Sequence, residues 1–166
     1  GTEMSIEELE RQLGNIEDAY AKSSAGRHLA RHYVEREEYD KAIAYYQDAL
    51  TAQGLSPVAN REMLRELAQV YLLKKDYTIA VHTLQQALAI DLVAEVADFL
   101  LLARAQYHLG QYVDVVATLD ALREAGLTLN TEQMRQALAL YYRTGAYAQC
   151  EVLLQRLLEL QPDEAQ

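Results

Sequence analysis

Residues 67–87 read LAQVYLLKKDYTIAVHTLQQA, in which apolar residues at helical spacing stand on both sides of a short polar turn. Within this stretch Tyr77 is followed three residues later by Ala80, and the same pairing of a tyrosine with a small or β-branched residue recurs along the chain. Its four copies are Tyr39 with Ala42, Tyr77 with Ala80, Tyr112 with Val115, and Tyr147 with Cys150. The small position recurs after 38, 35 and 35 residues, and a period in this range is typical of helical repeats that stack on one another.

The apolar spacing predicts four pairs of helices and no strand. Cap and turn residues support this interpretation: Ser56 precedes Pro57, Asn130 can cap the helix that follows it, and Gly110 and Gly145 lie at turns within pairs. We expect the paired helices at about 24–36 and 39–53, 57–74 and 77–90, 93–109 and 112–125, and 131–144 and 147–160.

A further helix is predicted near the N-terminus, over residues 5–22, because Ser5 begins a capping-box pattern that an amphipathic stretch follows. Its apolar spacing resembles that of the second helix in the later pairs, so we expect it to be the second helix of a preceding repeat. The opening residues look like a remnant of cloning. The predicted organisation is a remnant at 1–4, the N-terminal helix at 5–22, the repeat array at 23–162 and a C-terminal tail at 163–166.

The composition indicates one domain without a membrane span. The chain has 166 residues, of which 51% are hydrophobic, and a formal net charge of −10. This charge opposes nonspecific binding to nucleic acids and to anionic membranes. No stretch approaches the roughly 18–20 apolar residues that a transmembrane helix requires. We therefore expect a soluble protein, cytoplasmic or periplasmic, because the single Cys150 excludes an internal disulfide without deciding the compartment.

The repeat positions resemble those of the tetratricopeptide repeat (TPR) family over residues 23–162. The residues that carry the resemblance are Leu29, Ala30, Tyr33, Tyr39, Ala42, Tyr46 and Ala49, then Leu67, Ala68, Tyr71, Tyr77, Ala80, Leu84 and Ala87, and finally Gly145, Tyr147, Leu154, Leu157 and Pro162. The third repeat departs from the family with Val115 and Leu122 at alanine positions, and the first two have Gly54 and Leu92 where the family has proline. The resemblance implies an all-α, right-handed superhelical solenoid of antiparallel helix pairs, with about four repeats plus the N-terminal helix.

By the same resemblance, the first helix of each pair lines a concave groove that binds another protein. The matching positions are Arg27, Arg31, Arg65, Gln69, Arg104, Tyr107, His108, Arg135 and Tyr142. Arg27 and Arg31 are one helical turn apart and could share one anion. The alternative is a solvated face on which Glu62, Glu66 and Glu132 neutralise the arginines. The clamp that TPR cochaperones use for chaperone tails is not expected, because Glu66, Ala97 and Leu101 occupy positions of that clamp.

Catalytic and metal-binding patterns are weak in this sequence. His28 and His32 lie one turn apart and could chelate a metal, but no third ligand is indicated. Cys150 occupies a repeat position for small residues, so we expect it to be buried and inert. Neither His82 nor His108 has a supporting catalytic partner. We therefore predict neither an enzyme nor a cofactor.

The function predicted first is a noncatalytic scaffold that binds a peptide or helix, with acidic groups, from another protein. Three alternatives remain open. The segment could be an assembly element that self-associates through uncovered ends, where Leu153, Leu154, Leu157 and Leu158 are expected to be exposed. Residues 137–142 and 157–162 also resemble TPR proteins of TonB-type systems in Gram-negative bacteria, which would imply a periplasmic scaffold. RNA binding is a third hypothesis, and the negative net charge opposes it.

Overall fold

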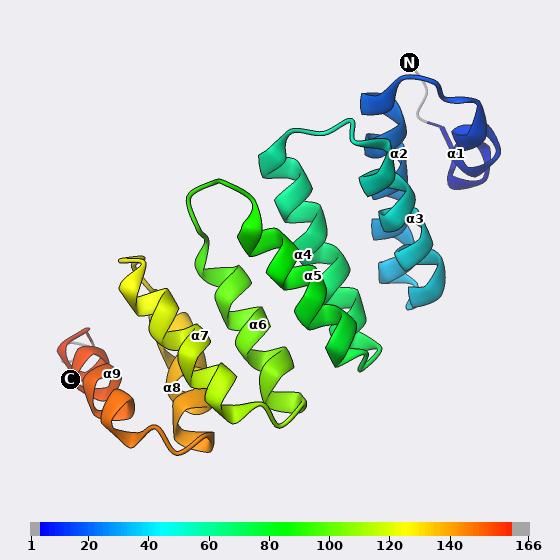
Figure 1. Ribbon diagram of the computed structural model, residues 1–166. Helices are drawn as coiled ribbons and strands as arrows, with labels where there is room; N and C mark the ends of the chain where they lie inside the picture. The colour runs from blue at the N-terminus through cyan, green and yellow to red at the C-terminus, as the bar shows by residue number, and fades with distance from the viewer. Residues whose placement is uncertain (1–3, 161–166) are drawn as a thin grey trace. The chain divides into compact units, whose positions relative to one another are not determined.

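The computed structural model describes residues 4–160, and within that range every regular element is helical. Residues 1–3, Pro162 and the predicted tail at 163–166 lie outside the described residues. The helices are α1 (Ile6–Gln12), the short 3-10 helix η1 (Leu13–Asn15), α2 (Ala19–Glu35), α3 (Tyr39–Ala52), α4 (Pro57–Leu73), α5 (Tyr77–Ala89), α6 (Val96–His108), α7 (Tyr112–Glu124), α8 (Thr131–Arg143) and α9 (Tyr147–Leu160) (Figure 1). The all-α prediction is confirmed, and the predicted bounds of the paired helices lie within three residues of these, except at the start of α2.

The N-terminal region differs from the single helix predicted over 5–22. Helix α1 ends at Gln12, and α2 begins after Asp18, whose carboxylate accepts a hydrogen bond from the Ala21 amide at 2.8 Å. Gly14 disfavours helix in between, and Asp18 supplies a cap that starts a new helix. The prediction of one continuous helix was therefore wrong, because it missed the start signal at Asp18.

The chain divides into two compact units, at residues 1–76 and 77–166. Unit 1 contains α1 to α4, and its main contact is between the antiparallel helices α2 and α3. Ala42 and Ala49 of α3 are fully buried, as the repeat pattern predicts. Gly26 of α2 lies so near to α3 that a Cβ atom there would be 3.0 Å from the Cβ of Ala49. Small side chains therefore set the close spacing of these helices.

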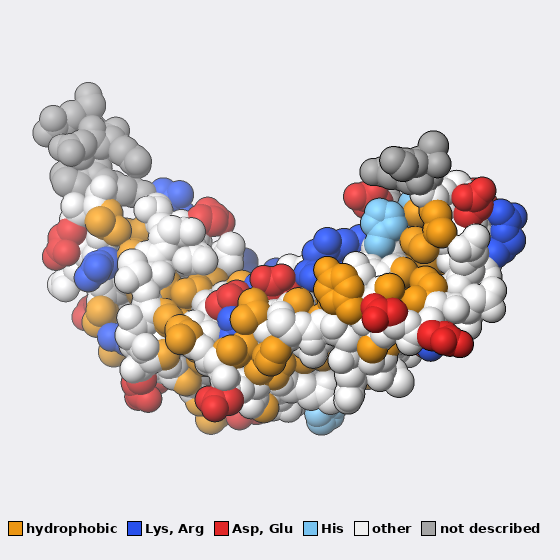
Figure 2. Space-filling model, turned by 90° about the horizontal axis from the view of Figure 1, so that it is seen from above, with side chains coloured by type: hydrophobic (Ala, Val, Ile, Leu, Met, Phe, Trp, Pro, Cys, Tyr) orange, Lys and Arg blue, Asp and Glu red, His pale blue; other side chains and the backbone are white. Residues whose placement is uncertain are grey.

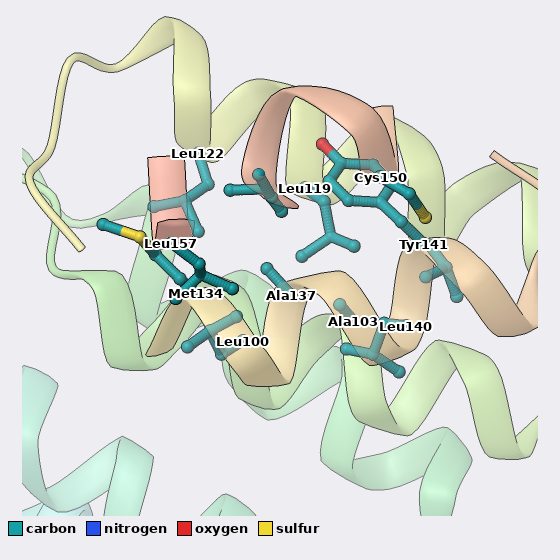
Figure 3. Packing of buried hydrophobic residues seen from close by; sticks show 12 residues of the cluster. Leu100, Ala103, Leu119, Leu122, Met134, Ala137, Leu140, Tyr141, Cys150 and Leu157 are labelled. Carbon is teal, nitrogen blue, oxygen red and sulfur yellow. The ribbon is translucent and has the colours of Figure 1, made fainter. Parts of the chain in front are cut away.

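Unit 2 contains α5 to α9 and has a core built from four helices. Figure 3 shows Leu100 and Ala103 of α6, Leu119 and Leu122 of α7, Met134, Ala137, Leu140 and Tyr141 of α8, and Cys150 and Leu157 of α9 around one interior. Cys150 is buried, as predicted, and so are Val115 and Leu122, which replace the alanines of the family pattern. Larger side chains are thus accommodated at these positions inside a continuous core.

The turns within the helix pairs require a left-handed residue, which is glycine in some repeats and not in others. Gly110 and Gly145 have φ of 74° and 82°, whereas Glu37 adopts φ of 60° in the turn between α2 and α3. We expect Glu37→Gly to stabilise unit 1 by about 0.5–1 kcal/mol, because glycine adopts this conformation without the steric cost of a Cβ atom.

Urea unfolding followed by circular dichroism measures the effect. The matched control is Glu35→Gly, which makes the same change in the last turn of α2 and should destabilise the unit by about 1 kcal/mol. A Glu37→Gly variant that is less stable than the parent would contradict the conformational argument.

No helix within residues 4–160 combines the length and the apolar character needed to cross a membrane.

Candidate protein-binding surface

The predicted groove arginines of unit 1 are engaged by a carboxylate of the same unit. Arg31 of α2 donates through Nε and Nη2 to the two oxygens of Glu66 on α4, both at 2.8 Å. Arg27 donates to Glu66 through Nη2 as well, and its Nη2 lies 3.4 Å from an oxygen of Glu62. Tyr46 of α3 adds a hydrogen bond from its hydroxyl to Glu66 at 3.0 Å. Glu66 therefore accepts hydrogen bonds from three side chains.

The electrostatics of this cluster favour an ionised Glu66. Burial opposes its charge, but the hydrogen bonds from Arg31 and Arg27 outweigh that effect and lower the pKa of Glu66 to about 2. The hydrogen bond with Glu66 raises the pKa of Arg31, and burial together with the neighbouring Glu66 raises the pKa of Tyr46. The guanidinium groups thus face a partner within the chain that stays charged at neutral pH.

The arginines of this cluster differ in access to solvent. The Arg27 side chain is 15% exposed and the Arg31 side chain is 56% exposed. Arg65, also predicted in the groove, is half-buried on α4, and Gln69 is exposed one turn later. The structure thus shows the neutralisation by Glu62 and Glu66 that the sequence left as an alternative.

In unit 2 the predicted residues lie on α6 and α8, which pack against each other. Arg104 and His108 stand one turn apart on α6, Arg135 lies on α8, and all three are exposed. Among the described residues, no carboxylate oxygen lies within 4.0 Å of a side-chain nitrogen of Arg104 or Arg135. Glu132, expected to neutralise the arginines, is exposed and forms no ion pair within the same range. These two arginines are therefore available to another molecule, unlike Arg27 and Arg31.

The predicted aromatic residues of unit 2 follow these arginines by one or two helical turns and form ring contacts at the C-terminal ends of α6 and α8. His108 stacks on Tyr77 with ring centroids 4.5 Å apart, and Tyr107 stacks on Tyr112 at 5.5 Å. The guanidinium of Arg143 lies over the Tyr107 ring, 5.9 Å from its centroid. These contacts fix the orientation of Tyr107 and His108 without burying His108.

Tyr142 of α8 is 66% exposed and lies near Tyr147, with ring centroids 5.7 Å apart, whereas its neighbour Tyr141 is buried. Its exposure places Tyr142 at the surface. Tyr77, Tyr112, Arg143 and Tyr147 take part in these ring contacts and were not predicted from the sequence. The three tyrosines belong to the repeated pair of a tyrosine and a small residue, and this pair was interpreted as a sign of helix packing only.

Other candidate chemistry finds no support in the geometry. The described residues contain no group of three or more histidine, cysteine, aspartate or glutamate side chains placed to hold a metal ion. Burial raises the pKa of the Cys150 thiol, which disfavours the reactive thiolate. Basic and acidic side chains lie interspersed with apolar ones on the face drawn in Figure 2.

Neither a family model nor a curated protein matches the sequence. Among solved structures, one from Podospora anserina is described by its nearly identical TPR-like repeats. It is 20% identical with a TM-score of 0.75, and the match covers 96% of this chain and 86% of that one.

Two further structures are similar over most of this chain. YrrB, described as a TPR protein with an unusual peptide-binding site, is 19% identical with a TM-score of 0.65, covering 95% of this chain and 80% of that one. The protein PilF of Pseudomonas aeruginosa is 17% identical with a TM-score of 0.67, covering 94% of this chain and 67% of that one. Identities this low establish the fold alone. This chain therefore has the all-α fold of TPR-like repeat proteins.

Proposed function

We propose that this chain is a noncatalytic protein–protein interaction module, and that the exposed face of α6 and α8 binds an acidic segment or helix of a partner. The observation that carries the proposal is that Arg104 and Arg135 are exposed and form no ion pair among the described residues. The TPR-like fold agrees with a scaffold function, and YrrB, which shares the fold, is described by its peptide-binding site.

The chemistry of this face suits carboxylates. A guanidinium group without an internal partner can form two parallel hydrogen bonds to one carboxylate, and such charge-assisted pairs are among the stronger polar contacts. Tyr142 adds a large exposed ring that can cover apolar parts of the partner. Because the chain carries a net charge of −10, long-range attraction does not favour an acidic partner. Recognition would therefore depend on short-range contacts with these arginines.

The test uses two fluorescein-labelled synthetic peptides of 12 residues, one in which glutamate alternates with leucine and tyrosine, and one with lysine in place of every glutamate. In fluorescence anisotropy, Arg104→Glu with Arg135→Glu should weaken binding of the acidic peptide by about 100-fold. Each lost charge-assisted contact is worth about 1.5–3 kcal/mol, and 1.4 kcal/mol corresponds to tenfold.

The matched control is Lys22→Glu with Arg156→Glu, which changes the net charge equally at exposed positions on α2 and α9. It should leave the affinity within about threefold of the parent, since distant surface charges are screened by salt. Equal losses in the two double variants would show that net charge, and not this face, determines binding.

Self-association is retained as a second candidate because part of α9 is uncovered. Leu154 and Leu158 are exposed one turn apart, whereas Leu153 and Leu157, also predicted to be exposed, are buried in the unit 2 core. An exposed leucine pair on one helix face can pack against another helix. The periplasmic scaffold of a TonB-type system stays a prediction from the sequence.

A further inference from the structure

Unit 2 has a second surface, formed by the second helices of two pairs, α7 and α9. Two open hollows lie along it, of about 430 Å³ and about 540 Å³. We call them together the outer groove. Its lining residues are Tyr112, Val113, Val116, Ala117, Asp120 and Thr144 in the first hollow, and Asp120, Arg123, Glu124, Ala148, Gln149 and Val152 in the second. Asp120 lines both hollows, so they adjoin at this residue.

The outer groove is distinct from the face that carries Arg104 and Arg135. On α7, Val113, Ala117 and Glu124 lie on the side of the helix opposite the one that buries the core residues, and Val116 lies at its border and packs partly against the core. The two surfaces meet at Tyr112, which lines the first hollow and also stacks on Tyr107 of α6. Their charged residues are distinct, because Asp120 and Glu124 belong to α7, whereas Arg104 and Arg135 belong to α6 and α8.

Apolar side chains that are open to solvent line both hollows of the outer groove. Val113 is 84% exposed, and Tyr112 and Val152 are each about half exposed. Ala117 and Ala148 are small, so the space above them stays open. Clustered exposed apolar side chains beside a hollow mark interaction surfaces more often than isolated ones do.

The charged part of the lining has two carboxylates, Asp120 and Glu124, and one guanidinium, that of Arg123. Asp120 and Glu124 stand one turn apart on α7, and within residues 4–160 no lysine, arginine or histidine nitrogen lies within 4.0 Å of either carboxylate. The Tyr141 hydroxyl donates to Oδ1 of Asp120 at 2.7 Å, which holds this carboxylate in place at the middle of the groove. Burial and the bond to Asp120 raise the pKa of Tyr141, so the phenol remains a neutral donor.

We propose that the outer groove binds a segment of a partner protein in which lysine or arginine residues alternate with aliphatic ones. The cationic groups meet Asp120 and Glu124, and the aliphatic side chains occupy the space beside Val113 and Ala117. The net charge of −10 attracts a basic partner at long range. It repels a second copy of this chain, which makes the copy the less favoured occupant.

This proposal does not depend on the function proposed for the α6 and α8 face. If both hold, one chain joins an acidic segment on one surface to a basic segment on the other. Such a bridge is an ordinary role for a repeat scaffold, and here the opposite charges of the two surfaces would keep the two partners from exchanging places.

The test titrates the isotope-labelled full chain with a synthetic 14-residue peptide in which lysine alternates with valine and leucine, and with a counterpart that has glutamate at every lysine. We expect the lysine peptide to shift the amide NMR signals of Val113, Ala117, Ala148 and Val152. Asp120→Asn with Glu124→Gln should weaken its binding at least tenfold, and the new amide oxygen can still accept the Tyr141 hydrogen bond. Ala117→Arg, which fills the groove, should weaken it to a similar degree.

The control is Glu35→Gln with Asp91→Asn, which removes the same charge from exposed sites elsewhere and should change the affinity less than threefold. The proposal is overturned if the lysine peptide shifts signals of α6 and α8 instead, if the glutamate peptide binds equally well, or if neither peptide binds. It is also overturned if sedimentation shows a dimer that Ala117→Arg dissociates, because a second copy would then occupy the groove.

Discussion

Gly54→Ala should destabilise unit 1 by at least about 3 kcal/mol, a size typical of severe overpacking. A Cβ atom on Gly54 would lie 1.9 Å from the carbonyl oxygen of Ala19 and 2.1 Å from its carbonyl carbon. Both are backbone atoms of the first turn of α2, which cannot rotate away as a side chain can. The variant must therefore separate the turn after α3 from the start of α2.

That separation is costly because hydrogen bonds join the two segments. The Gly54 amide donates to the Ser23 hydroxyl at 2.9 Å, and the same hydroxyl donates to the carbonyl of Ala49 at 2.8 Å. Ser23 is fully buried, so water cannot replace these bonds without opening the helix pair. Relief of the clash would leave buried polar groups without partners.

Two other glycines provide a graded control for urea unfolding followed by circular dichroism. A Cβ atom on Gly14 would meet nothing within 4 Å, so Gly14→Ala should be neutral or slightly stabilising. A Cβ atom on Gly26 would be 3.0 Å from a side-chain carbon of Ala49 and 3.2 Å from the Tyr45 carbonyl oxygen, so Gly26→Ala should fall between the two. A loss below about 1 kcal/mol for Gly54→Ala would contradict the predicted contact.

Gly54 also shows which parts of the fold could be predicted from the sequence. Helix pairs could be predicted because apolar periodicity and caps are local signals, and Ser56, Pro57 and Asn130 mark helix starts in the structure. Gly54 was interpreted as a missing family proline. Its role depends on contact with Ala19, which is distant in sequence, and no local pattern reports such a contact.

The candidate surfaces, too, could be predicted from the sequence only in part. Helical spacing predicted that Arg27, Arg31, Arg104 and Arg135 belong to first helices. It could not show which of these arginines have a carboxylate partner within the chain. The distinction arises because α4 places Glu66 beside α2, while α6 and α8 place no carboxylate beside their arginines among the described residues. The outer groove was not predicted at all, since it is the space that remains between α7 and α9 after the core has packed.

Glu66→Gln should reduce the stability of unit 1 by about 2–3 kcal/mol at neutral pH. The amide retains the shape of the carboxylate but not its charge, and it leaves Arg27, only 15% exposed, beside Arg31 without an anion that bridges them. A pKa lowered from the ordinary 4.5 to about 2 corresponds to about 3 kcal/mol of stabilisation by the charged form. Residual solvent access to the cluster places the expected loss somewhat below that figure.

The pH dependence follows from the same shift. Because the pKa of Glu66 is lower in the folded state, its contribution is fully present above about pH 4.5 and is lost as the pH falls toward 2. Glutamine does not titrate, so the difference in unfolding free energy between parent and variant should shrink over this window. Urea unfolding at pH 7, 4 and 2.5 measures the difference. A gap that stays constant down to pH 2.5 would show that the variant acts through packing and not through charge.

Glu62→Gln is the matched control, since the Glu62 side chain is 44% exposed and meets Arg27 only at 3.4 Å. It should cost less than about 1 kcal/mol, as exposed ion pairs do. Glu66→Gln has a second expected result, because it removes the anionic partner of the exposed Arg31, whereas Arg27 keeps Glu62 at 3.4 Å. If neutralisation by Glu66 is what prevents Arg31 from binding carboxylates, the Glu66→Gln variant should bind the acidic peptide at a second site. Adding Arg31→Glu should remove that site, and the Glu62→Gln variant should have one peptide site only.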